Sequence, residues 1–243
     1  MLRIYYDLHI HSALSPCAAA DMTPNDIIGM AILNGLNLIA ITDHNSLSNA
    51  PAIVTAAKTI NSLHGTNLIV LPGIEVSTAE EVHVLCLFKN IENASDFEKD
   101  LSKYYPIIQN RIDIFGNQTL FDESDNIKGE MERMLIAPTT ISFDELYDLT
   151  HKHNGAFIPA HIDRSSFSVI SNLGFIPPHL KITTVEVSPN GLENGFLENN
   201  KDITQQMNVI FSSDAHQLWA ISEKENYIML PECTADAAID FLR

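Results

Sequence analysis

The sequence predicts a single domain of the α/β class, in which buried strands alternate with helices. Three observations favour this fold. Short apolar runs, such as residues 36–42, suit strands that are covered on both faces of a parallel sheet. Segments with apolar residues at helical spacing lie between these runs. A polar cluster follows most of the strands, and the carboxyl ends of parallel strands are where barrels and open α/β folds place their active sites.

The first half of the chain shows this order clearly. Residues 2–11 form the first predicted strand, and Thr23-Pro24 then begins a helix as its N-cap and first position. Gly35 ends that helix, and the strand at 36–42 leads into Asp43-His44. A second helix at 51–64 ends before Gly65, and the strand at 67–71 leads into Pro72-Gly73-Ile74-Glu75.

The second half is less regular at its start. A fourth strand at 82–88 carries His83, and residues 89–140 follow with a helix near 97–105 and an acidic stretch at 122–132. We interpret 89–140 as an insertion or a lid within a single domain of residues 1–243, and a solvated surface excursion is an equal alternative. Ser142 and Glu145 then form a capping box that begins a helix to about residue 154. Strands at 156–160, 183–187 and 209–213 complete a set of about seven, and the last leads into Asp214 and His216.

Composition limits the partners and the compartment. The chain has 243 residues and a net charge of −17, with 31 acidic side chains against 14 basic ones. Such a field repels phosphate backbones, so long nucleic acid is not expected as a partner unless bound cations reverse the sign locally. Three widely spaced cysteines favour a reducing compartment, and the lack of a signal-peptide pattern or a long apolar run predicts a cytoplasmic protein without membrane contact. The oligomeric state is left open.

Histidines and carboxylates gather at the predicted strand ends. His9 and His11 are two residues apart on a strand, so their imidazoles lie on the same face. The strand ends also carry a larger set: Asp43, His44, Glu75, His83, His161, Asp214 and His216. So many imidazoles and carboxylates at one site require counter-ions, and mixed nitrogen and oxygen ligands suit zinc, manganese or iron.

The motifs DLHIHS, TDHNS, GIEVS and SSDAH, with a later strand-borne histidine, resemble the PHP (polymerase and histidinol phosphatase) superfamily. The resemblance runs from residue 7 to residue 216. It implies a distorted (β/α)7 TIM-like barrel with two or three divalent metal ions at the carboxyl ends of the strands. It also implies the ligands, with His9, His11, Glu75 and Asp214 on a first metal, Glu75, His83 and His161 on a second, and His44 and His216 on a third.

The sequence departs from the family pattern at the third metal. Many members place an Asp or His a few residues after the HxH motif, where this chain has Pro16. Cys17 or Asp21 could replace that ligand, and a thiolate would favour zinc. The other alternative is a weak or empty third site. Two firm metals are therefore expected, with the third left open.

Two further residues have competing interpretations. Asp43 either orients His44 or a metal-bound water, which we favour, or caps the turn that follows it. Arg164 lies three residues after His161 in a chain with few basic residues, and its guanidinium could bind a phosphate in bidentate fashion. The alternative for Arg164 is a salt bridge to Asp163 or another nearby carboxylate.

Together these features predict a metal-dependent phosphoesterase that hydrolyses a small phosphomonoester with a metal-activated water. Glu75, Asp214, His216 and Arg164 are the expected catalytic residues, with His216 as one possible proton donor to the leaving oxygen and Arg164 as the substrate-binding residue. Exonuclease-like or phosphodiesterase activity on nucleic-acid ends or nucleotides is the second candidate. A regulatory PHP module that binds metal without catalysis is the candidate from another class.

Overall fold

The structure is a computed structural model that describes residues 1–243, except for the side chain of Thr204. The strands are β1 (Leu2–Ile10), β2 (Leu38–Ile41), β3 (Ile69–Ser77), β4 (His83–Leu87), β5 (Thr119–Phe121), β6 (Ile127–Glu130), β7 (Ala156–Pro159), β8 (Thr184–Val187), β9 (Asn208–Phe211) and β10 (Tyr227–Leu230). The α-helices are α1 (Pro24–Leu33), α2 (Ala50–His64), α3 (Ile91–Leu101), α4 (Ile112–Phe115), α5 (Phe143–Lys152), α6 (Val169–Leu173), α7 (Pro189–Glu193), α8 (Phe196–Asn199), α9 (Lys201–Gln206) and α10 (Ala235–Leu242).

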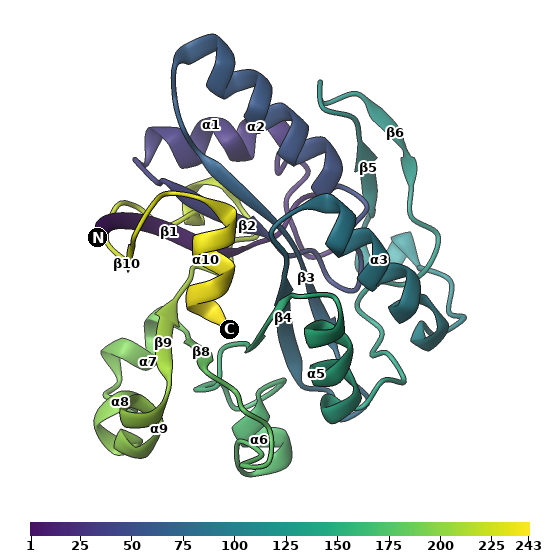
Figure 1. The fold of residues 1–243 in the computed structure, drawn as a ribbon. Coiled ribbons are helices and arrows are strands. Elements are labelled where there is room, and N and C mark those ends of the chain that lie inside the picture. Colours follow the sequence, from purple (N-terminus) through teal and green to yellow (C-terminus); the bar gives the residue numbers. More distant parts are fainter.

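A curved six-stranded sheet with the order β10-β1-β2-β3-β4-β7 forms the centre of the molecule (Figure 1). Strands β1, β2 and β3 are parallel, whereas β10 and β4 pair antiparallel with their neighbours. Strands β8 and β9 form a separate parallel pair. A bridge between Ile10 and Ala215 joins the end of β1 to the segment that follows β9. The chain therefore has a mixed α/β fold whose sheet curls like part of a barrel.

Each of the seven strands expected from the sequence is present, as β1, β2, β3, β4, β7, β8 and β9. They do not form one continuous ladder, because β8 and β9 pair with each other and not with the central sheet. The α/β class and the barrel-like curvature are confirmed, whereas a full set of seven strand–helix units stays a prediction.

The direction of β4 differs from the expected alternation of strands and helices. Only residues 78–82 separate β3 from β4, and such a short connection can join antiparallel neighbours only. Register pairs Ser77 with His83 and Glu75 with Leu85. Since β4 runs backwards, its first residue lies at the edge where β1 and β2 end. His83 thus reaches the site from the beginning of a strand.

Helix ends follow the local signals in the sequence. Thr23 caps α1 through the amide of Asp26, and Gly65 ends α2 in a left-handed conformation with φ 67°. Ser142 and Glu145 form both hydrogen bonds of the capping box at the start of α5. In Figure 1, α1 and α2 lie together on one side of the sheet, and α3 and α5 lie near β3 and β4. These helices bury the outer face of the strands that carry the polar cluster.

The segment at 89–140 docks on the loops that follow β1 and β2. The side-chain amide of Asn45 donates to the carbonyl oxygens of Leu135 and Ala137, at 2.7 and 3.1 Å. The Asn49 side chain bonds the backbone of Thr119 and Phe121 in the β5–β6 hairpin. The helix expected near 97–105 lies earlier, as α3, because Asn90 caps it. The function of this segment as an insertion or lid stays a prediction.

None of the helices in the described part of the chain combines the length and the apolar character needed to cross a lipid bilayer.

Candidate metal centre

The structure brings together all eight side chains that the sequence predicts as metal ligands. They come from the ends of β1, β2, β7 and β9, from the middle of β3 and from the beginning of β4. The set is His9, His11, His44, Glu75, His83, His161, Asp214 and His216. Their rings lie against one another, as in the pair His11–His216 with ring centroids 4.2 Å apart.

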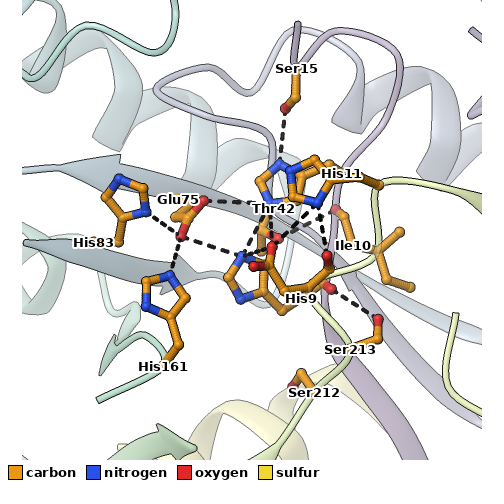
Figure 2. Close-up of polar contacts among 12 residues, drawn as sticks. His9, Ile10, His11, Ser15, Thr42, Glu75, His83, His161, Ser212 and Ser213 are labelled. Atoms are coloured by element: carbon orange, nitrogen blue, oxygen red, sulfur yellow. Dashed lines mark hydrogen bonds and ion pairs between the residues drawn. The ribbon is translucent and has the colours of Figure 1, made fainter. Parts of the chain in front are cut away.

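Glu75 is the centre of this cluster (Figure 2). Its carboxylate is 1% exposed, and Oε1 lies 2.8 Å from His83 Nδ1 and 3.2 Å from His161 Nε2. Oε2 lies 2.8 Å from His44 Nδ1 and 3.4 Å from His11 Nε2. The contact with His44 lacks the angles of a hydrogen bond, which leaves Oε2 without a hydrogen-bond partner among the described residues. One buried carboxylate thus faces imidazoles from β4 and from the loops after β1, β2 and β7.

His9, His11 and Asp214 form a second focus. The Nε2 atoms of His9 and His11 are 3.1 Å apart, and Asp214 Oδ1 lies 3.2 Å from the first and 3.1 Å from the second. Two imidazole nitrogens at this distance can share one proton at most. A cation satisfies both lone pairs and the carboxylate together.

Hydrogen bonds at Nδ1 fix the tautomers of three histidines. His9 Nδ1 donates to Glu186 Oε2 at 2.9 Å, His11 Nδ1 donates to Ser15 Oγ at 3.0 Å, and His216 Nδ1 donates to the carbonyl oxygen of Asp214 at 2.8 Å. Each contact places the proton on Nδ1, so Nε2 keeps its lone pair for the cluster. This arrangement is how proteins orient histidines that bind metals.

The electrostatics of the cluster show competition for protons. Burial raises the pKa of Glu75, but the imidazoles of His83, His9 and His44 lower it well below its usual range. Burial lowers the pKa of His9, yet Glu186, Asp214 and Glu75 raise it well above its usual range. Burial and the neighbouring imidazoles of His216 and His44 all lower the pKa of His11, which lies well below its usual range. A cation in place of a proton on His9 Nε2 would satisfy Asp214 and Glu75, while Nδ1 still donates to Glu186.

These residues fit metal ions in three overlapping groups. The groups are His9, His11 and Asp214; His44, Glu75 and His83; and His11, His44 and His216. Within each group the ligand atoms lie within 4.8 Å of one another. The groups share His11 and His44, which differs in detail from the division into three ligand sets that the resemblance implies.

The PHP domain family matches residues 7–171, more than half of the chain and most of the strands that carry this cluster. The chain belongs to the PHP family. The resemblance to the PHP family that the sequence motifs indicated is thereby confirmed.

Known relatives of this PHP chain include enzymes of nucleic-acid metabolism. A 5'-3' exoribonuclease, Rnm of Salmonella typhimurium, is 32% identical over 100 residues, which cover 40% of this chain and 31% of the relative. The chain therefore spans less than a third of that curated relative. The lesion-specific endonuclease PfuEndoQ of Pyrococcus furiosus shares the fold with a TM-score of 0.67 at 17% identity, over 99% of this chain and 56% of the endonuclease. An amidohydrolase of Chromobacterium violaceum with bound sulfate has a TM-score of 0.57 at 17% identity, over 95% and 93% of the two chains.

These likenesses conflict with the expectation that long nucleic acid is not a partner. That expectation came from the net charge of −17, which describes the whole surface. A cluster of cations at one site can attract phosphate in spite of the surrounding field.

Asp43 supports the PHP centre less directly than the sequence indicated. Its Oδ1 accepts from the amide of Ser12 at 2.7 Å and from Ser15 Oγ at 2.7 Å, and its Oδ2 accepts from Ser12 Oγ at 2.6 Å. Ser15 Oγ in turn accepts from His11 Nδ1 and from the amide of His44. Asp43 thus fixes the loop after β1, and orients His11 through Ser15.

Glu186 is the functional residue of the PHP centre that sequence reasoning missed. It lies within β8 and is 1% exposed, and its Oε2 accepts both from His9 Nδ1 and from the amide of His161 at 3.1 Å. A carboxylate in the middle of a short buried strand, flanked by valines, was the available signal. Its role depends on contacts with distant strands, which spacing in the sequence does not reveal.

The backbone is strained where it carries ligands. His161 and Asp214 have φ values of 31° and 53°, in the left-handed region that residues with side chains rarely adopt. Such strain persists at functional sites where surrounding contacts over-determine the conformation. The bridge from Ile10 to Ala215 and the hydrogen bond from the His161 amide to Glu186 supply those contacts here.

Arg164 and Cys17 lie at the edge of the PHP centre. The Nη1 atom of Arg164 donates to Asp214 Oδ2 at 2.8 Å, and the Arg164 side chain is 42% exposed. The alternative of a salt bridge to a nearby carboxylate is therefore realised with Asp214, while Asp163 accepts from Ser188. Burial raises the pKa of the Cys17 thiol, but hydrogen bonds with His216 and His44 lower it to about 7.

Proposed function

We propose that this chain is a metal-dependent phosphoesterase that hydrolyses a small phosphomonoester. The observation that supports this proposal is the buried carboxylate of Glu75 within a shell of imidazoles, two of which, His9 and His11, have their tautomers fixed by Glu186 and Ser15. An arrangement of this kind is costly without cations and serves no evident packing role. Phosphoester cleavage is the reaction that closely spaced metal ions in such ligand shells usually catalyse.

The metal-holding residues follow from the contacts. His9, His11 and Asp214 would hold one ion and Glu75 with His83 and His161 a second, and Glu75 lies between the two groups. Bound divalent ions in such a site supply Lewis-acid stabilisation of phosphate oxygens and lower the pKa of water.

Arg164 would bind the phosphate of the substrate. The ion pair with Asp214 uses the Nη1 atom of Arg164. A guanidinium carries five N–H donors. Its 42% exposure leaves donors available at the edge of the cluster. In this role Arg164 also connects the substrate to Asp214.

Cys17 would complete a third metal site with His44 and His216, in place of the ligand that Pro16 removes. Cys17 is exposed, and His216 and His44 act on its thiol strongly enough to lower the pKa to about 7, which favours a thiolate next to them. His216 Nδ1 is occupied by the carbonyl oxygen of Asp214, so Nε2 is its one nitrogen for a metal or for a proton. We assign His216 Nε2 to the metal, and its use as proton donor is then excluded while the metal is bound.

Metal content and turnover, measured on the same samples, test the proposal. Manganese- or zinc-loaded protein should bind about two or three metals and hydrolyse p-nitrophenyl phosphate or members of a phosphomonoester panel. Glu75→Gln should lose both metal and activity, whereas His64→Ala, at the exposed end of α2, provides the matched control. Arg164→Ala should raise the Michaelis constant and retain the metal. Full metal loading without turnover of any phosphoester would instead favour the regulatory module.

The relationship to an exoribonuclease favours nucleic-acid ends as a second candidate substrate. The net charge of −17 would restrict this activity to short ends and nucleotides, since each further phosphate of a long strand adds to the repulsion. Short 5'-phosphorylated oligonucleotides belong in the same substrate panel.

A further inference from the structure

Phe167 is an exposed aromatic residue beside the metal centre that the proposed reaction does not use. Its side chain is 46% exposed, although a phenylalanine is usually buried. Its ring stacks on the imidazole of His83, with centroids 4.8 Å apart and an interplanar angle of 23°. His83 in turn contacts Glu75 at 2.8 Å. One aromatic plane therefore lies next to the ligand shell and remains accessible to solvent.

The backbone holds this ring in place by strain and by hydrogen bonds. Phe167 has a φ of 56°, a conformation that is unfavourable for a bulky side chain. Its carbonyl oxygen accepts from the amide of His83 at 2.9 Å, and Ser168 Oγ donates to the carbonyl oxygen of Arg164 at 2.8 Å. The loop at 161–168 is thus tied to β4 and folded back on itself. The exposed position of Phe167 is built into the loop and does not result from a loose end.

The same loop carries Arg164, the cation assigned to the substrate phosphate. A guanidinium and a rigid exposed aromatic ring on one loop form a combination that suits nucleotides, because the cation pairs with phosphate while the ring stacks on a base. A sugar phosphate or an alkyl phosphate offers no flat face to such a ring.

We propose that Phe167 determines specificity by stacking on the base of a nucleoside phosphate whose phosphate lies at the metal centre. This inference rests on the proposed phosphoesterase function and names the class of its substrate. The nucleoside phosphate can be a free nucleotide or the terminal nucleotide of a short strand.

Matched substrates test this inference. Adenosine 5'-monophosphate and ribose 5-phosphate differ only in the base, and a 5'-phosphorylated dinucleotide with and without its first base gives the same comparison for a strand end. We expect the manganese-loaded protein to favour the base-containing member of at least one pair by about tenfold in kcat/KM. The pair that shows the preference identifies the source of the nucleotide.

Variants separate stacking from a structural role. Phe167→Leu, which keeps an apolar side chain, should reduce the preference close to one, whereas Phe167→Tyr and Phe167→Trp should keep it. Phe175→Leu alters another exposed phenylalanine, beyond α6, and should keep the wild-type ratio. Metal content shows whether each variant retains its site. If Phe167→Leu loses metal, the substrate preference of Phe167→Tyr is the test, and its loss in a metal-loaded Phe167→Tyr protein overturns the inference.

The inference is overturned if the wild-type protein shows no preference in either pair, or if Phe167→Leu keeps it. Absence of all turnover would contradict the proposed phosphoesterase and leave stacking open to a separate measurement. Equilibrium dialysis of the same four compounds with metal-loaded wild-type and Phe167→Leu protein then gives the ratio from binding alone, and equal binding by the two proteins overturns the inference.

Discussion

At the scale of single residues, the metal centre is determined as much by the partners of the ligands as by the ligands themselves. His9 shows this dependence most clearly, because Glu186 accepts its Nδ1 proton at 2.9 Å and leaves Nε2 for a cation. Glu186 also accepts from the amide of His161 and so positions a second ligand. Removal of its charge should therefore weaken metal binding although Glu186 itself faces away from the cations.

Glu186→Gln should lower the affinity for the most tightly held metal about tenfold, since partners of this kind typically contribute 10- to 100-fold. The glutamine keeps the size of the side chain but loses the charge that raises the basicity of His9. Competition with a chromogenic chelator measures the change. Glu193→Gln, at an exposed position of α7, should retain wild-type affinity, and equal affinities for all three proteins would contradict the role of Glu186.

Cys17→Ser tests the third metal site. Cobalt-substituted wild-type protein should show the near-ultraviolet charge-transfer absorption of a thiolate ligand, and the variant should lack it. Cys233→Ser replaces a half-buried cysteine distant in sequence and should leave the band intact. Cobalt binding to the wild-type protein without this band would assign the third site to other ligands or leave it empty.

At the scale of elements, contacts between helices hold the frame around the centre. Asp100 in α3 accepts from Lys152 at 2.7 Å and from His153 at 2.9 Å, at the end of α5. Hydrogen bonds from Lys152 and His153 lower the pKa of Asp100 from 3.8 to about 2. Because the folded state depresses this pKa, the contact stabilises the protein above pH 4, and the contribution disappears as the pH falls toward 2.

Asp100→Asn should lower the melting temperature slightly at pH 7, and its difference from the wild type should shrink as the pH falls below 4. The effect is small because the side chain of Asp100 is 37% exposed and solvent screens the pair. Asp96→Asn, also on α3 and exposed, is the control. A difference that stays constant from pH 7 to pH 3 would show that charge on Asp100 does not contribute.

The sequence predicted the strands better than their directions. Residues 36–42, 67–71 and 156–160 are apolar because both faces of β2, β3 and β7 are covered, so their positions could be predicted from composition alone. The antiparallel direction of β4 depends on the short connection after Ser77. The sequence shows this connection, but we interpreted β4 as one more strand in an alternating order of strands and helices. β10 was missed, although its alternation of exposed and buried residues is typical of a strand with one solvated face.

The metal-binding side chains could be predicted because most of them follow or begin a strand that the sequence marks clearly, although Glu75 lies within β3 and not after it. Their partners could not, since Glu186 acquires its role from a contact between distant strands and Ser15 acquires its role from the folding of the loop after β1. The role of Phe167 could not be predicted from the sequence either. Its exposure and its left-handed backbone are properties of a folded loop, and a single phenylalanine in a sequence carries neither signal.

At the scale of the whole molecule, the acidic surface and the metal centre act in opposite directions on a phosphorylated substrate. The net charge of −17 repels polyphosphates over a distance set by the ionic strength, about 10 Å at 0.1 M. Cations at the centre attract the one phosphate that reaches them. The affinity for a short substrate therefore depends mainly on the metal centre. Each further phosphate of a longer substrate adds repulsion from the acidic protein.

This balance predicts an unusual response to salt if the chain cleaves nucleic-acid ends. At low ionic strength, kcat/KM should fall as an oligonucleotide is lengthened from two to about twenty nucleotides, and added salt should raise kcat/KM for the long substrates. Proteins that bind nucleic acid through basic surfaces behave in the opposite way, because salt weakens their contacts with phosphate. A mononucleotide measured in the same buffers corrects for effects of salt on the centre itself. A rise in kcat/KM with length at low salt would instead show that a surface of this chain attracts the strand despite the overall charge.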